Sequence, residues 1–260
     1  MVTTRLRFAS LGSGSRGNGT LFEMGGTTIL VDCGFSLRQT EARLQRLGKS
    51  LQDIDAIVVT HEHGDHLGGV RRAASKGGIP VWMTAGTASE AERRHGLFDS
   101  VRIIGGHERF SIDGIEINPF HVLHDASEPV QFTFSNGGCT VGLLTDLGEV
   151  TPHIERQLGG CDALLLECNH DPELLAAGSY PIFLQKRVAG RLGHLSNRQA
   201  AVLLKKIDTS RLQHLAVMHM SEKNNREELA ASSICGALGC EREWISIATQ
   251  QDGLGWREIV

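Results

Sequence analysis

The chain has 260 residues, of which 40% are hydrophobic and 22% charged, and its 30 acidic and 26 basic side chains give a formal net charge of −4. This composition is typical of a soluble globular protein, and no apolar run approaches the roughly 18 residues that a membrane-spanning helix needs. A mildly acidic chain should repel polyanions, so net charge alone argues against nucleic acid as a partner. Histidine supplies 12 residues, which is a first hint of metal binding.

The N-terminus and the cysteines predict a cytoplasmic protein. The first residues lack the apolar stretch of about 7 to 15 residues that a secretory leader needs. The six cysteines form no Cys-x-x-Cys pair and stand mostly among apolar residues. In a reducing compartment we expect most of them to be small buried thiols.

Short strands dominate the first part of the chain. Alternating or β-branched residues predict strands over 5–11 and 27–31, separated by a glycine-rich and serine-rich loop over 12–19. A helix is expected over 36–47, with Ser36 as its N-cap and Gly48 as its stop. Further strands are expected over 56–60, 101–104, 112–117, 130–135, 139–144 and 163–167, with a hairpin turn at 136–138.

The last third of the chain has a more helical pattern. Amphipathic segments predict helices over 197–207 and 227–238, and between them an apolar strand over 212–218 ends at His219. No repeat or flexible linker interrupts the sequence. We therefore expect one domain over residues 1–260, built from α and β layers.

The strongest chemical signal is His61-x-His63-x-Asp65-His66, which follows the buried strand 56–60 directly. A turn loosened by Gly64 would let these four side chains point into one volume, while the strand fixes the position of the turn. A solvated polar loop is the alternative interpretation, but such loops seldom hold three histidines and a carboxylate within six residues. The spacing therefore predicts a metal site.

This motif resembles the signature of the metallo-β-lactamase superfamily, and the other motifs of that superfamily follow in order. Asp32 resembles the first motif, His124 the third, Asp146 the fourth and His219 the fifth. The resemblance covers almost the whole chain. It implies an α/β fold of four layers, an αββα sandwich.

The resemblance also implies a centre of two divalent metal ions. Asp32 would orient the ligand loop from outside, Asp146 would bridge the ions, and a hydroxide held between them would attack the substrate. Mixed imidazole and carboxylate ligands suit Zn²⁺ or Mn²⁺, and also iron. The implied ligands are His61, His63 and His124 for one ion and Asp65, His66 and His219 for the other.

Two features point from the superfamily towards a nuclease. Asp146 stands where true β-lactamases usually have a cysteine, which argues against antibiotic hydrolysis. Segments 167–170 and 193–197 resemble those of ribonuclease Z-like phosphodiesterases, in which the counterpart of His194 protonates the leaving oxygen. Asp65 would orient the hydroxide. The alternative for His194 is a structural place beside a helix N-cap.

The resemblance is stronger to the bacterial YycJ/WalJ (VicX) group of small members. Shared segments include 12–18, 124–129, 193–197 and 219–225, with Met220 as a conservative departure. This group implies a metal-dependent DNase with 5′-to-3′ exonuclease action and a part in DNA repair. Only 73 positions separate Asp146 from His219 (219 − 146), so a cap domain like that of larger nucleases does not fit.

Local charge supports a polyanionic substrate despite the acidic average. Residues 182–211 contain seven basic side chains and one acidic one, a local charge of +6, and this stretch surrounds His194. We therefore expect DNA rather than RNA as the partner, gripped near the metals, and no membrane. The expected substrate contacts are Arg191, Ser196, Asn197, Arg198, Ser221 and Asn224.

Three alternatives stay open. An RNA-processing ribonuclease would use the same centre on another polymer, and a glyoxalase II-like thioester hydrolase would not need the basic stretch. A binding or regulatory protein would keep the metals for structure alone.

Overall fold

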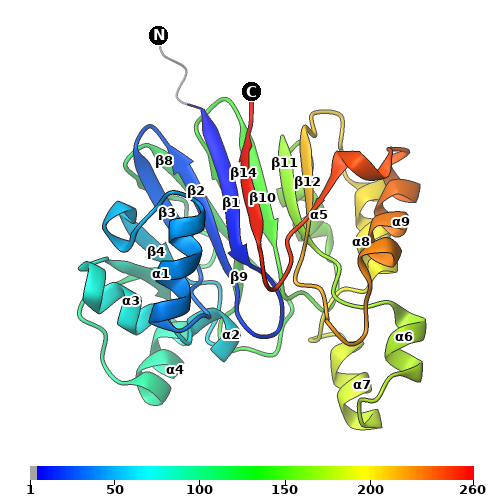
Figure 1. Cartoon of the computed structure of the whole chain (residues 1–260), viewed down its shortest axis with the longest axis horizontal. Coiled ribbons are helices and arrows are strands. Elements are labelled where there is room, and N and C mark those ends of the chain that lie inside the picture. Colours follow the sequence, from blue (N-terminus) through cyan, green and yellow to red (C-terminus); the bar gives the residue numbers. More distant parts are fainter. Residues whose placement is uncertain (1–4) are drawn as a thin grey trace.

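The computed structural model describes residues 5–260 and shows two β-sheets packed face to face, with helices on both outer faces (Figure 1). The first sheet has the order β14-β1-β2-β3-β4-β5-β6, and the second β13-β12-β11-β10-β9-β8-β7. These four layers confirm the predicted αββα sandwich.

The first sheet takes its strands from the first part of the chain and from the C-terminus. They are β1 (Leu6–Gly12), β2 (Gly19–Met24), β3 (Thr27–Val31), β4 (Ala56–Val58), β5 (Val81–Thr84), β6 (Val101–Ile104) and β14 (Leu254–Glu258). The second sheet is built from β7 (Phe110–Ile112), β8 (Ile115–His121), β9 (Val130–Ser135), β10 (Thr140–Leu144), β11 (Ala163–Glu167), β12 (His214–Met218) and β13 (Ile245–Ile247).

The helices cover the outer faces and fill the connections. Those of the first half are α1 (Leu37–Arg46), α2 (Gly64–Leu67), α3 (Val70–Gly77) and α4 (Ala85–His95), with a 3₁₀ turn η1 at Leu51–Asp53. Those of the second half are α5 (Pro152–Leu158), α6 (Pro172–Ala177), α7 (Ile182–Val188), α8 (Asn197–Lys206) and α9 (Glu227–Leu238), with η2 at Arg242–Trp244. Among the described residues no helix is both long and apolar enough to cross a bilayer.

Three apolar clusters hold the layers together. The central one lies between the sheets, where Phe22 stacks on Phe134 with ring centroids 3.9 Å apart. A second cluster packs the first sheet against its helices, and a third packs the second sheet against α5, α8 and α9. Burying apolar surface on both faces of each sheet is what makes the stacked arrangement stable.

Two sequence expectations illustrate what local patterns do and do not predict. The helix at 36–47 is confirmed as α1, because the Ser36 hydroxyl accepts a hydrogen bond from the Gln39 amide and forms a capping box. The single strand expected over 112–117 is wrong. Asp113 and Gly114 adopt φ values of 43° and 89° and turn the chain between β7 and β8, as an Asp-Gly pair in a two-residue hairpin does.

The sheets place six strand ends at one rim. β3 and β4 run parallel in the first sheet, and β10, β11 and β12 run parallel in the second. β8 pairs antiparallel with β9, and β9 with β10, so β8 shares the direction of β10. The carboxyl ends of such strands are where open α/β sheets collect functional side chains.

Candidate metal centre

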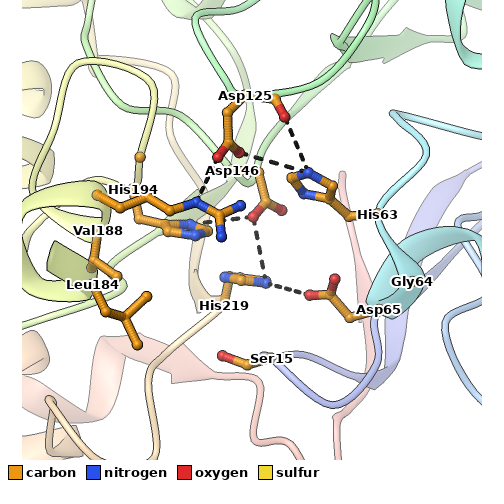
Figure 2. A pocket seen from close by; sticks show the side chains of 12 residues that line it. Ser15, His63, Gly64, Asp65, Asp125, Asp146, Leu184, Val188, His194 and His219 are labelled. Atoms are coloured by element: carbon orange, nitrogen blue, oxygen red, sulfur yellow. Dashed lines mark hydrogen bonds and ion pairs between the residues drawn. The ribbon is translucent and has the colours of Figure 1, made fainter. Parts of the chain in front are cut away.

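A pocket of about 300 Å³ opens at this rim, between the two sheets. Figure 2 shows the side chains of His63, Asp65, Asp146, His194 and His219 directed towards one another around it. Three of these residues follow β4, β10 and β12, and Asp65 lies on α2. Residues from both halves of the chain therefore form one polar centre.

The first ligand loop runs from β4 into α2. His61 and His66 are buried, while His63 lies at the N-cap of the helix and faces the pocket. The loop is held from behind, since the Asn18 amide donates to the Asp65 carbonyl oxygen at 2.7 Å. Gly34 packs so closely on that carbonyl that a Cβ atom would overlap with it. The backbone around Asp65 is therefore fixed before any ligand binds.

One cluster consists of His61, His63 and His124, whose ligand-type nitrogens all lie within 4.8 Å of one another. His124 Nε2 is 3.2 Å from His63 Nδ1, and His61 Nε2 is buried without a hydrogen-bond partner. His124 Nδ1 lies 3.0 Å from the Gly193 carbonyl oxygen, to which it donates. That bond leaves the Nε2 lone pair directed into the cluster.

A second cluster consists of Asp65, His66 and His219, again within 4.8 Å. Asp65 Oδ2 is 3.3 Å from His219 Nε2 and 3.6 Å from His66 Nε2. Two imidazole nitrogens and one carboxylate oxygen that converge in this way match the mixed sets of ligand atoms that bind zinc, manganese and iron.

Asp146, the expected bridging residue, lies between the two clusters. Its Oδ2 is 2.8 Å from His66 Nε2, and its Oδ1 is 3.6 Å from His219 Nε2 and 3.9 Å from His124 Nε2. The residue is buried and also groups with His61 and His66 as possible ligands of one ion. One carboxylate thus reaches both clusters.

Asp32, which was expected to orient the ligand loop from outside, lies behind that loop. Its Oδ1 accepts a hydrogen bond from the Thr60 amide at 2.9 Å. Its Oδ2 accepts from the Thr60 hydroxyl and lies 2.8 Å from His66 Nδ1. With Nδ1 donating to this carboxylate, His66 keeps an Nε2 lone pair for the centre.

The backbone is strained at three of these positions. Asp32, Asp146 and His219 have φ values of 59°, 55° and 50°, in the left-handed region, and each lies within two residues of the end of a strand. Within residues 5–260 only one other non-glycine residue, Asp113, has a positive φ. Left-handed backbone at a non-glycine residue costs about 1 to 3 kcal/mol and tends to persist where it serves a functional arrangement.

The charges in the centre favour a cation. Burial lowers the pKa of His61, which is therefore neutral, as a metal ligand must be. Burial also lowers the pKa of His219, but Asp146, Asp65 and Glu167 outweigh it and raise that pKa to about 10. In the metal-free protein a proton on His219 therefore sits where the carboxylates would stabilise a divalent ion.

His194 forms a pair with Glu167 at the side of the pocket. His194 Nδ1 lies 2.8 Å from Glu167 Oε1 and 3.2 Å from Asp146 Oδ1. Burial lowers the pKa of His194, yet Glu167 and Asp146 outweigh it, and the net pKa is raised. Glu167 itself is fully buried and accepts from the amides of Leu147 and Leu195 at 2.9 and 3.1 Å.

None of the six predicted substrate contacts is among the residues that line the pocket. Ser196 caps α8, and the Asn197 amide exchanges hydrogen bonds with Asn225 in the interior. Ser221 and Asn224 are buried and bonded to each other. Arg191 and Arg198 are exposed, and Arg191 pairs with Glu149.

Sequence reasoning missed the pocket wall opposite the ligand loop. Leu184, Arg187 and Val188 of α7 line it, together with Asp125. Arg187 Nε donates to Asp125 Oδ2 at 2.7 Å, and Asp125 Oδ1 is 3.6 Å from His63 Nε2. The position of Asp125 next to His124 was one available signal, and the basic stretch 182–211 was the other, since it contains α7.

Comparison with known proteins agrees with this geometry. The profile of the beta-lactamase superfamily domain matches residues 27–220. The chain belongs to the β-lactamase superfamily. Its fold resembles that of a solved metallo-beta-lactamase fold protein, YhfI from Bacillus subtilis, with a TM-score of 0.75, 16% identity and coverage of 98% of this chain and 100% of that chain.

Two curated superfamily relatives match over most of their length. The chain is 34% identical over 235 residues to the exodeoxyribonuclease YycJ of Bacillus anthracis, covering 90% of this chain and 89% of that protein. It is 34% identical over 236 residues to the exodeoxyribonuclease WalJ of Streptococcus pneumoniae, covering 89% and 88%. The predicted relationship to the YycJ/WalJ group is confirmed.

Proposed function

We propose that this protein is a cytoplasmic, metal-dependent exonuclease that hydrolyses phosphodiester bonds in DNA. The observation that carries the proposal is the pairing of two ligand clusters, joined by Asp146, with a histidine–carboxylate pair that faces the same pocket. The likeness to two exodeoxyribonucleases over about nine-tenths of the chain supports DNA as the substrate.

The residues fit two divalent ions, Zn²⁺ or Mn²⁺, with iron as a third candidate. One ion would be held by His61, His63 and His124. The other would be held by Asp65, His66 and His219, and Asp146 would contact both ions. When bound, such ions neutralise charge that develops on a phosphoryl group and make bound water more acidic. The unpartnered His61 Nε2 and the buried carboxylates of this centre are the features that call for cations.

The protein's own groups would supply positioning and a proton. Glu167 holds the Nδ1–H of His194, so that the other ring nitrogen, Nε2, is free to donate to the leaving oxygen. The raised pKa of His194 keeps that proton available near neutral pH. Asp65 and Arg187 line the same pocket, where Asp65 would orient the attacking water and Arg187 would contact a phosphate oxygen.

A test of the proposal uses purified protein with Zn²⁺ or Mn²⁺ on end-labelled duplex DNA, single-stranded DNA and RNA. We expect metal-dependent release of nucleotides from DNA ends, loss of release in His61→Ala, and weaker cleavage at higher salt. We further propose 5′-to-3′ polarity and a role in DNA repair, by analogy with the YycJ/WalJ group, and a 5′ label released first would support the polarity. Absence of metal-dependent DNA cleavage would refute the proposal, and preferred cleavage of RNA or of a thioester would favour the alternatives.

The role of His194 has a sharper test in the leaving group. His194→Gln should slow DNA cleavage by about 10²- to 10⁴-fold, the usual contribution of general acid catalysis. Cleavage of bis(p-nitrophenyl) phosphate, whose leaving group needs no proton, should fall much less. Equal losses on both substrates would assign His194 to structure or metal binding instead.

A further inference from the structure

The helix α7 is unusual because none of its residues is buried. Ile182 and Phe183 in its first turn are 70% and 73% exposed. Figure 1 shows α6 and α7 projecting beyond the layers of the sandwich. An apolar pair on a projecting helix adds little to the core, and exposed apolar side chains that gather beside a pocket commonly contact a ligand.

One face of α7 forms a wall of the candidate metal centre. Leu184, Arg187 and Val188 line the pocket, and their spacing places them on one side of the helix (Figure 2). Phe183 precedes Arg187 by one turn, about 6 Å along the axis. Nucleotides in a duplex rise about 3.4 Å each, so Phe183 stands within one or two nucleotides of a phosphate at Arg187.

The helix is anchored to the centre at its C-terminal end. Arg187 Nε bonds to Asp125, and the His194 amide donates to the Val188 carbonyl oxygen at 2.9 Å. Gly193 packs so closely on the Arg187 and Val188 carbonyls that any side chain would overlap with them. The position of Phe183 is therefore coupled to the position of His194.

The charges on α7 favour a nucleic acid over other occupants. Lys186 and Arg187 are exposed beside Phe183, and Arg191 follows on the next loop, which combines aromatic and basic side chains as single-strand binding surfaces do. A symmetric contact with a second copy would bring these like charges together. A polyanion with flat apolar bases matches both properties.

We propose that Phe183 stacks on a nucleobase next to the phosphate held at the metal centre, and thereby selects DNA ends. The inference rests on the proposed nuclease function. In a duplex only the terminal pair presents a free base face, so a ring one helical turn from the pocket-lining Arg187 would contact a base there and nowhere along the interior. Phe183 is a specificity-determining residue in this view, with Arg187 contacting the adjacent phosphate.

The test compares Phe183→Ala, Phe183→Trp and Phe183→Leu with Leu97→Ala, a control at a side chain that is 75% exposed and outside the pocket lining. Stacking of one base on an aromatic ring changes affinity by about 5- to 150-fold. We expect Phe183→Ala to raise KM for blunt duplex ends about tenfold with little change in kcat. Phe183→Trp should restore KM, whereas Phe183→Leu should not, and Leu97→Ala should behave as the wild type.

The outcomes separate this inference from the proposed function. The inference is overturned if Phe183→Ala keeps the wild-type KM, or if Phe183→Leu restores KM as well as Phe183→Trp does. In either case, DNA cleavage by the wild-type protein leaves the proposed function standing. Wild-type protein that hydrolyses bis(p-nitrophenyl) phosphate but not DNA overturns both. A dimer that Phe183→Ala dissociates, with KM for DNA unchanged, assigns the patch to a second copy and also overturns the inference. Melting temperature and metal content of each variant establish that it is folded.

Discussion

Asp32 controls one histidine in each metal cluster, and Asp32→Asn is the change that exposes this control. His61 Nδ1 lies 2.9 Å from the Thr60 hydroxyl, which donates to Asp32 Oδ2 at 2.8 Å. His66 Nδ1 lies 2.8 Å from the same oxygen. With both ring nitrogens donating along these bonds, the carboxylate leaves an Nε2 lone pair on each histidine, directed at the centre.

Asparagine reverses this pattern with little change in shape. Its oxygen must remain opposite the Thr60 amide, 2.9 Å from Asp32 Oδ1, so its amino group takes the place of Oδ2. That donor forces His66 Nδ1 to accept, and the ring proton moves to Nε2. Asparagine tolerates the φ of 59° at this position, so backbone strain does not confuse the result.

We expect the affinity for each ion to fall by about 10- to 100-fold, the usual effect of losing an outer partner of a metal-binding histidine. This equals about 1.4 to 2.8 kcal/mol per ion. Competition with a chromophoric chelator measures it directly. Thr60→Val should lower the metal affinity mainly of the cluster that contains His61. Asp55→Asn is the matched control, since the Asp55 carboxylate accepts from the Thr28 amide at 2.7 Å, and it should leave the metal affinity of both clusters unchanged.

Wild-type affinity at both sites in Asp32→Asn would refute the tautomer argument. So would a loss confined to the stability of the fold, with metal stoichiometry and affinity unchanged. A loss at one site only would show that the hydroxyl of Thr60 does not transmit the effect to His61.

Three further outcomes follow from contacts described above. The pKa of His219 is raised to about 10 and that of His66 is also raised, so metal binding near pH 7 should release about two protons. Calorimetry in buffers of different ionisation enthalpy measures this release. Identical enthalpies of metal binding in all the buffers would contradict the prediction. Burial raises the pKa of Glu23, but Lys49 and Arg7 outweigh it and leave that pKa below 4.5. The Glu23 carboxylate therefore stabilises the fold fully above pH 4.5, and this stabilisation is lost as the pH falls through the folded pKa. The free energy of urea unfolding of metal-free Glu23→Gln should depend less on acid pH than that of the wild type. Gly34→Ala should displace the ligand loop at Asp65, lower the free energy of unfolding by about 1 to 3 kcal/mol and lower the metal content. A wild-type melting temperature with full metal content would show that the loop accommodates the added methyl group.

The grouping of the candidate metal ligands could be predicted because the sequence information for it is local. His61, His63, Asp65 and His66 share one loop, and their spacing alone predicts a metal site. Each of the other predicted ligands follows or lies close behind a recognisable strand, and the superfamily resemblance supplies its role. The strand pattern itself was less secure. Ile112 and Ile115 are three residues apart, which a continuous strand would place on opposite faces, and this spacing was the overlooked sign of the turn at Asp113-Gly114.

The rest of the site depends on contacts between distant residues. Arg187 and Asp125 are 62 positions apart and meet only because α7 is anchored against the loop after β8. Polar residues near a motif were also assigned to the substrate too readily. Asn197 and Asn224 are buried and bonded within the protein, and a sequence does not reveal whether the partner of a polar side chain is a ligand or the fold.

The strand order also governs how the chain acquires its structure. β14 pairs with β1, and 241 residues lie between the end of β1 at Gly12 and the start of β14 at Leu254. At about 5 to 20 residues per second, a ribosome needs roughly 12 to 50 seconds to cover that distance. During this interval β1 is an open edge that can pair with a neighbouring chain. We expect that edge to stay unpaired until β14 has been synthesised, so that nascent chains depend on chaperones more than refolding chains do.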